Sequence, residues 1–153
     1  MIIVSWPATG KSYYKGYQNI LDLEGSPFKY LSPKSKSKTL TEKGPVSSEW
    51  PANYFNYLKK VKNNYDAVLA PSVQHDIIEL LLKENIEFTV VLPDKSLKDE
   101  YIRRCVDRGD NTEWQKYFMD TWDERHSYLT SLKARTIVLE AGEYLEHAFK
   151  RLD

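Results

Sequence analysis

The sequence predicts a three-layer α/β fold, in which a mostly parallel sheet of about five strands lies between two layers of helices. Short apolar runs rich in β-branched residues recur along the chain, and segments with helical spacing separate them. Each run is apolar throughout, as expected for a parallel strand that is buried on both faces. The predicted strands are residues 2–4, 20–23, 67–70, 88–92 and 136–139.

Helical spacing predicts the segments that connect these strands. Thr112 and Gln115 have the spacing of a capping box, and the apolar residues that follow predict one long helix over residues 112–132. The other expected helices are residues 51–61, 77–85 and 142–152. Residues 32–48 interrupt this alternation with Ser, Lys, Thr, Pro and Gly, so we predict a mobile surface loop there.

The composition predicts one domain without a dominant charge. A chain of 153 residues is long enough for one sizeable core and too short for two ordinary domains, so we treat residues 1–153 as one unit. Lysine plus arginine and aspartate plus glutamate number 22 each, so no overall field favours nucleic acid or an anionic membrane. Cys105 is the only cysteine, which excludes an intramolecular disulfide and fits the reducing cytosol. The first apolar run is too short for a signal peptide or a membrane span, so we expect a cytoplasmic protein.

The segment with the most specific chemistry directly follows the first predicted strand. It reads Ser5-Trp6-Pro7-Ala8-Thr9-Gly10-Lys11-Ser12 and precedes an expected short helix, the context that a phosphate-binding P-loop requires. In such a loop backbone N–H groups surround a phosphate, glycine allows its close approach, and lysine reaches the β- and γ-phosphate oxygens. We therefore predict that ATP binds to Ser5, Pro7, Ala8, Thr9, Gly10, Lys11 and Ser12, with the Ser12 hydroxyl as a Mg²⁺ ligand.

Two features depart from the P-loop pattern. Ser5 stands where the pattern has its first glycine, and this would restrict the loop if that position needed a positive φ angle. The third predicted strand ends in Ala70-Pro71-Ser72, without the aspartate of a Walker B site, and Asp66 lies at its other end. A Gly-Lys-Ser triplet also occurs by chance, but the strand before it favours a P-loop.

At this point the chain resembles the small P-loop kinases of the adenylate-kinase-like, shikimate-kinase-like and polynucleotide-kinase-like group, and most of all short kinase-like proteins encoded by bacteriophages. The loop of residues 5–12 carries the specific part of this resemblance. Softer marks are the strand end at residues 21–24, Trp50-Pro51, and the stretch from Leu92-Pro93-Asp94 to Arg108-Gly109. For a protein encoded by a phage, the expected compartment is the host cytoplasm.

The resemblance implies roles for residues outside the loop. Asp22, with Glu24 as the second choice, matches a carboxylate that orients or deprotonates the acceptor, or supports Mg²⁺. Trp50 and Tyr54 are candidate acceptor-site aromatics. Residues 94–112 match a lid, whose arginines would clamp the transferred phosphate: Arg104 and Arg108 first, then Arg103.

Each of these roles has a plain alternative. Asp22 has the residue type of a turn or helix cap, and the aromatic side chains can simply pack in the core. Asp99 with Arg103 and Glu100 with Arg104 have the spacing of surface ion pairs on a helix.

Three functional hypotheses follow. The first is an ATP- and Mg²⁺-dependent kinase that acts on a nucleoside, a nucleotide or a similar small acceptor. The second is an ATP-binding regulator or partner-binding protein without catalysis, which Ser5 and the missing Walker B aspartate favour. The third is a polynucleotide 5′-hydroxyl kinase, for which Lys34, Lys36, Lys38 and Lys43 in the polar loop would contact nucleic acid, although such lysines are typical of a solvated tract.

Overall fold

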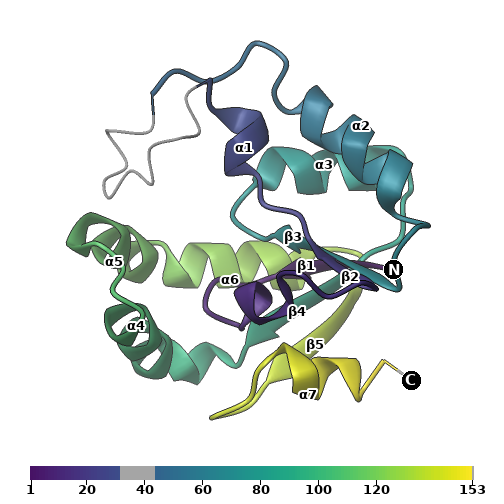
Figure 1. Ribbon diagram of the computed structural model, residues 1–153. Helices are drawn as coiled ribbons and strands as arrows, with labels where there is room; N and C mark the ends of the chain where they lie inside the picture. The colour runs from purple at the N-terminus through teal and green to yellow at the C-terminus, as the bar shows by residue number, and fades with distance from the viewer. Residues whose placement is uncertain (32–43, 153) are drawn as a thin grey trace.

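A five-stranded, all-parallel sheet forms the centre of the protein. The computed structural model describes residues 1–31 and 44–152. The strands lie in the order β2-β3-β1-β4-β5 (Figure 1). They are β1 (Ile2–Ser5), β2 (Ile20–Asp22), β3 (Ala67–Pro71), β4 (Thr89–Pro93) and β5 (Arg135–Leu139). All five predicted strands are present, each within one residue of its expected ends, and the fold class is α/β as predicted.

Helices cover both faces of this sheet. They are the 3₁₀ turn η1 (Lys11–Tyr14), α1 (Ser26–Lys29), α2 (Ala52–Val61), α3 (His75–Lys83), the 3₁₀ turn η3 (Lys95–Leu97), α4 (Lys98–Asp107), α5 (Thr112–Asp120), α6 (Trp122–Ser131) and α7 (Leu145–Phe149). Figure 1 shows α7 on one side of the sheet and α3 on the other. The arrangement is compatible with three layers, α/β/α.

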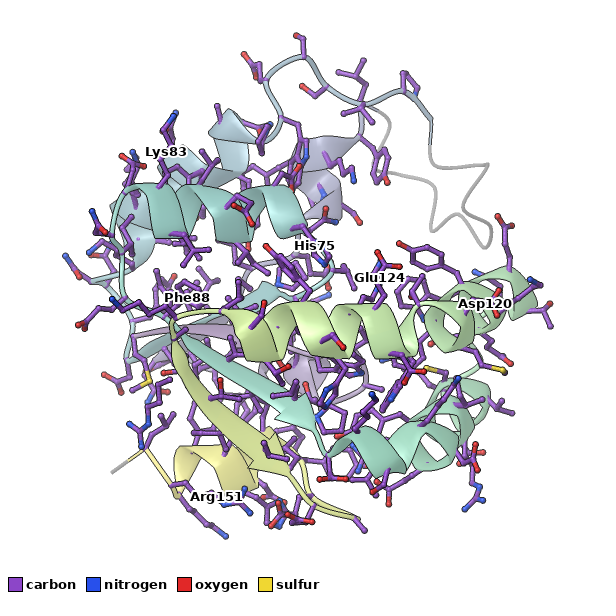
Figure 2. All side chains as sticks on the ribbon, turned by 180° about the vertical axis from the view of Figure 1, so that it is seen from behind. His75, Lys83, Phe88, Asp120, Glu124 and Arg151 are labelled. Carbon is purple, nitrogen blue, oxygen red and sulfur yellow. The ribbon has the colours of Figure 1, made fainter. Side chains whose placement is uncertain are left out.

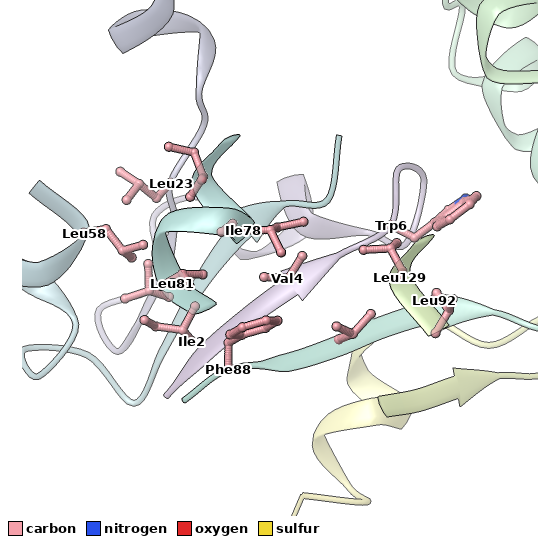
Figure 3. Packing of buried hydrophobic residues seen from close by; sticks show 14 of the residues in the cluster. Ile2, Val4, Trp6, Leu23, Leu58, Ile78, Leu81, Phe88, Leu92 and Leu129 are labelled. Carbon is pink, nitrogen blue, oxygen red and sulfur yellow. The ribbon is translucent and has the colours of Figure 1, made fainter. Parts of the chain in front are cut away.

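The side chains of β1 alternate between two hydrophobic clusters, as the two-residue period of a strand requires. Ile2 and Val4 lie in a large cluster with residues of α2, α3 and α6 (Figure 3). Ile3 lies in a smaller cluster with residues of η1 and α7. Both faces of β1 are therefore buried, which holds the loop that follows it in a defined position.

The prediction of one long helix over residues 112–132 is wrong, because the helix is interrupted at Thr121 between α5 and α6. The Thr121 hydroxyl donates a hydrogen bond of 2.7 Å to the Tyr117 carbonyl oxygen, a local bond that disturbs helices. The break accompanies the packing of Phe118 and Trp122, whose rings lie 6.0 and 4.9 Å from that of Trp6.

Other helix ends also differ from their predictions, and α3 begins and ends two residues earlier than expected. The N-cap of α5 is Asn111 rather than Thr112, because the Asn111 side chain accepts a 2.7 Å bond from the Trp114 amide. The closing helix α7 covers Leu145–Phe149, which is shorter than the expected 142–152.

The predicted polar loop of residues 32–48 is described only from residue 44 onward. Residues 32–43, which carry all four lysines of the polynucleotide hypothesis, lie outside the described residues. Val46 forms an antiparallel bridge with Tyr30. Among the residues that the structure describes, no helix has both the length and the apolar character needed to cross a bilayer.

Candidate functional site

The loop of residues 6–10 leaves the sheet where its connections diverge. From β1 the chain runs toward β2 and β3, whereas from β4 it runs toward β5 on the other side. In open α/β sheets, ligands bind beyond the carboxyl ends of the strands at such a switch point. The Trp6 amide donates a 2.9 Å bond to the Val91 carbonyl oxygen of β4, so the loop begins at the junction of β1 and β4.

Buried hydrogen bonds close the base of this loop. The Ser5 and Thr9 hydroxyl oxygens lie 2.5 Å apart, and the Thr9 hydroxyl donates a 2.7 Å bond to the Trp6 carbonyl oxygen. Ser5 belongs to β1, and the positive φ angles fall on Ala8 (62°) and Gly10 (93°). Serine at the first position therefore does not restrict the turn here; it supplies a buried hydroxyl to it.

Five consecutive backbone N–H groups in the loop have no acceptor. Within the described part of the chain, the amides of Ala8, Thr9, Gly10, Lys11 and Ser12 donate no hydrogen bond. Successive amides in turns that mix right- and left-handed conformations form concave anion-binding nests. The short η1 adds little helix dipole, so these amides are the main source of positive potential from the backbone.

The Lys11 ammonium has no ionic or hydrogen-bonding partner among the described residues, although the residue is only partly exposed. Burial lowers the pKa of Lys11 from 10.5 to about 8; the charge of Asp22 opposes this and that of Arg108 adds to it. A desolvated ammonium with no counter-ion is unfavourable in the free protein and favours an anionic ligand.

Asp22 ends β2 and lies within electrostatic range of Lys11. Its Oδ1 atom is buried and has no hydrogen-bond partner among the residues that the structure describes. Burial raises the pKa of the Asp22 carboxyl; Lys11 opposes that shift and Glu24 adds to it. Among the described residues, neither the Lys11 ammonium nor the Asp22 carboxylate has a hydrogen-bonding or ion-pair partner, and the two side chains belong to the neighbouring elements η1 and β2.

These residues suit Mg²⁺ together with phosphate rather than a metal site made of protein ligands alone. In the described residues no three His, Cys, Asp or Glu side chains form a metal-binding group. Magnesium commonly takes one or two carboxylates and completes its shell with phosphate oxygens and water. The unpaired Asp22 Oδ1 and the exposed Ser12 hydroxyl fit that role.

Arg104 is bonded to the loop and not directed at an open space. Its guanidinium donates bonds of 3.0 Å to the Ala8 carbonyl oxygen, 2.9 Å to the Glu143 carbonyl oxygen and 3.1 Å to Glu100. It also lies over the rings of Tyr101 and Tyr144, at 4.3 and 3.9 Å. The expected Glu100–Arg104 ion pair is present. Arg104 stabilises the loop through its hydrogen bond to the Ala8 carbonyl oxygen.

The other two lid arginines are placed differently. Arg108 pairs with Asp110, with an Nη2 to Oδ2 distance of 2.5 Å, yet its charge still acts on Lys11. Arg103 is exposed and forms no ion pair with any described residue, so the expected pair with Asp99 is not seen there. Arg108 is thus the lid arginine whose charge acts on the loop lysine.

The two aromatic candidates contact the elements that follow β2. Tyr54 is fully buried, and its hydroxyl donates a 2.7 Å bond to the Leu23 carbonyl oxygen, so it packs and does not face a ligand. Trp50 is partly exposed, and its Nε1 donates a 2.6 Å bond to Asp76. Trp50 thus keeps part of its surface exposed, whereas Tyr54 fixes the chain next to Asp22.

The end of β3 carries no carboxylate. Ser72 is buried, and its amide donates a 3.1 Å bond to the Ser5 carbonyl oxygen. Asp66, at the opposite end of the strand, accepts a 2.9 Å bond from Asn19. Asp22, one strand further out, is thus the carboxylate at this edge of the sheet whose charge reaches Lys11 most strongly.

The segment between β5 and α7 was missed by the sequence reasoning. The Leu145 amide donates a 3.0 Å bond to the Thr9 carbonyl oxygen, and a Cβ atom on Gly10 would lie 3.3 Å from Tyr144 Cδ1. No local pattern signals these contacts, because more than a hundred residues separate the partners.

The chain matches no protein-family model, no curated protein and no solved structure.

Proposed function

We propose that the protein is an ATP- and Mg²⁺-dependent phosphotransferase that acts on a nucleoside, a nucleotide or a similar small acceptor. One observation supports the proposal: among the described residues, five consecutive loop amides have no acceptor, and the neighbouring Lys11 ammonium forms no ion pair or hydrogen bond. A triphosphate supplies both what the amides lack and what the ammonium lacks.

In this proposal each residue has a limited task. The amides of residues 8–12 bind the phosphates, and Lys11 offsets the negative charge on the β- and γ-phosphate oxygens. Transfer breaks the bond between the γ-phosphorus and the bridging oxygen and forms a bond from that phosphorus to the acceptor oxygen. For a hydroxyl acceptor, the proton passes to Asp22, whose raised pKa makes it a better base than an ordinary aspartate.

Binding and turnover test the proposal separately. Wild-type protein is expected to bind Mg·ATP in calorimetry and to release ADP, in a coupled assay, with one member of a panel of nucleosides and nucleoside monophosphates. Lys11→Ala is expected to weaken binding and to lose turnover, whereas Lys60→Ala, which replaces an exposed lysine on α2, keeps both. Folded wild-type protein that binds no nucleotide would refute the proposal.

The second candidate is a nucleotide-binding protein without catalysis. The end of β3 favours it, because Ser72 stands where a metal-binding aspartate would be and its amide is bonded to Ser5. Binding of Mg·ATP with no ADP release from any acceptor in the panel would favour this candidate over the kinase.

The polynucleotide kinase hypothesis depends on lysines outside the described residues and stays a prediction. An affinity for a single-stranded oligonucleotide that falls steeply with salt would support it. Binding that is absent or insensitive to salt would count against it.

A further inference from the structure

A second polar pocket lies at the same edge of the sheet as the phosphate-binding loop. Its volume is about 350 Å³, within the range of small-molecule sites. It is formed by Lys29 of α1, by residues 73–76 that follow β3, and by the junction of α5 and α6. Figure 2 shows His75 at the start of α3 and Glu124 on α6 on the two sides of this space.

Arg125 brings an uncompensated cation to the pocket. Its Nε donates a 3.0 Å bond to the Thr121 hydroxyl, and its Nη2 donates to the Tyr117 hydroxyl. Its Nη1 is buried and has no acceptor in residues 1–31 and 44–152. No carboxylate among the described residues forms an ion pair with it. A guanidinium in this condition is stabilised by an anion.

His75 adds a second buried atom without a partner. Its ring stacks on Tyr128 with centroids 4.1 Å apart, which fixes its orientation, and its Nε2 atom makes no hydrogen bond within the described part of the chain. Burial, reinforced by Arg125, holds the pKa of His75 below its ordinary value, and Glu124, Asp76 and Glu79 oppose this. A bound oxyanion would favour the protonated ring, which donates from Nε2.

Lys29 is a second cation, and Asp76, an acid that lines the pocket, is already bonded. The Lys29 ammonium donates a 3.3 Å bond to Gln74 and has further donors to offer. The Asp76 carboxylate accepts bonds of 2.6 Å from Trp50 Nε1 and 3.0 Å from the Ile77 amide. Glu124 is exposed. The pocket thus offers more donors than its own acceptors use.

We infer that this pocket binds a phosphate monoester group of the acceptor through Arg125, His75 and Lys29, so that the acceptor is a phosphorylated molecule and not a neutral nucleoside. That the bound molecule is the acceptor of a kinase rests on the proposed function. That the pocket binds an anion does not depend on it. Glu124 and Gln74 at the rim would accept hydrogen bonds from hydroxyl or amino groups of the same ligand.

A histidine-resolved NMR titration with sodium sulfate tests the site directly. Sulfate keeps its charge across the range of histidine titration and stands for the phosphate. We expect sulfate to shift the His75 resonances and to raise the pKa of His75, in wild-type protein and equally in Lys11→Ala, which removes the loop lysine. Unchanged His75 resonances at saturating sulfate would overturn the inference. Acetate as a parallel probe distinguishes a phosphate site from a general anion site; equal affinity for both would overturn the phosphate assignment.

Two variants and a control complete the test. Arg125→Gln is expected to weaken sulfate binding about tenfold, as the loss of a charged hydrogen-bond donor does. Lys29→Gln, which does not touch the α5–α6 junction, is expected to weaken it severalfold, and Lys60→Gln not at all. Unchanged affinity in folded Lys29→Gln and Arg125→Gln proteins would overturn the assignment.

The outcome separates this inference from the proposed function. Sulfate binding at His75 without Mg·ATP binding would support the anion site and refute the kinase proposal. Mg·ATP binding and turnover of a neutral nucleoside, with His75 resonances that do not respond to sulfate, would support the kinase proposal and refute the anion site. Turnover of a nucleoside monophosphate whose KM rises in Lys29→Gln at constant kcat would support both.

Discussion

The loop of residues 5–12 and the helix α4 both carry cations that the sequence assigns to phosphate, yet their donors are in opposite conditions. Lys11 and the loop amides have no partners among the described residues, whereas the Arg104 guanidinium donates to the Ala8 and Glu143 carbonyl oxygens and to Glu100. A donor without an acceptor can still bond to a ligand that reaches it, whereas the Arg104 guanidinium already has three acceptors and supports the loop. Residue type alone does not distinguish the two, because both are cations near the same loop.

The largest effect is expected from breaking the support. Arg104→Gln should lower the free energy of unfolding by about 3 kcal/mol, because it leaves the Ala8 and Glu143 carbonyl oxygens without their charged donor. Urea denaturation measures this loss. The neighbouring Arg103→Gln is the control, and its exposed side chain predicts a change within about 0.5 kcal/mol. Equal stability of the two variants would contradict the comparison.

The next effect should fall on binding and not on stability. Lys11→Ala is expected to weaken Mg·ATP binding roughly thirtyfold, about 2 kcal/mol, since a charge-assisted contact is lost. Its stability should equal or exceed that of the wild type, because the buried ammonium is unfavourable in the free protein. Calorimetry and urea denaturation on the same preparation check both statements; a marked loss of stability would mean that Lys11 is a structural residue.

Gly10→Ala tests the close contact between the loop and Tyr144. It should lower the free energy of unfolding by about 2 kcal/mol, from left-handed strain at φ 93° and from a Cβ atom 3.3 Å from Tyr144. Gly109→Ala is a matched control, with φ 80° and no atom within 4 Å of the added Cβ. The difference between the two melting curves isolates the Tyr144 contact. No difference would mean that Tyr144 yields without cost.

The smallest effect expected is the pH dependence of nucleotide binding. The Lys11 pKa lies at about 8, so the ammonium is present below that pH and is lost as the pH rises through it. Affinity for Mg·ATP should therefore fall severalfold, by ~1 kcal/mol, from about pH 7 to about pH 9. Calorimetry across this range measures the slope, and the slope should disappear in Lys11→Ala. A rise in affinity with pH would contradict the assignment.

Local patterns predict most of the fold and the position of the loop. The five strands are short apolar runs, and the loop is recognisable because Gly10, Lys11 and Ser12 follow the first of them. The break at Thr121 is not predictable in this way, because the residues on both sides of it have helical spacing. It accompanies the packing of Phe118 and Trp122 around Trp6, which lies more than a hundred residues away in the sequence.

By itself the sequence determined the α/β class, the strands and the loop with Lys11, because these depend on neighbours within a few residues. Only the tertiary structure decided which cations are available to a ligand. Arg104 and Ala8 are separated by 96 positions, and the Thr9 carbonyl oxygen is bonded by Leu145 near the other end of the chain. Whether a polar group has a partner is a property of the folded chain, since the partner arrives from elsewhere in the sequence.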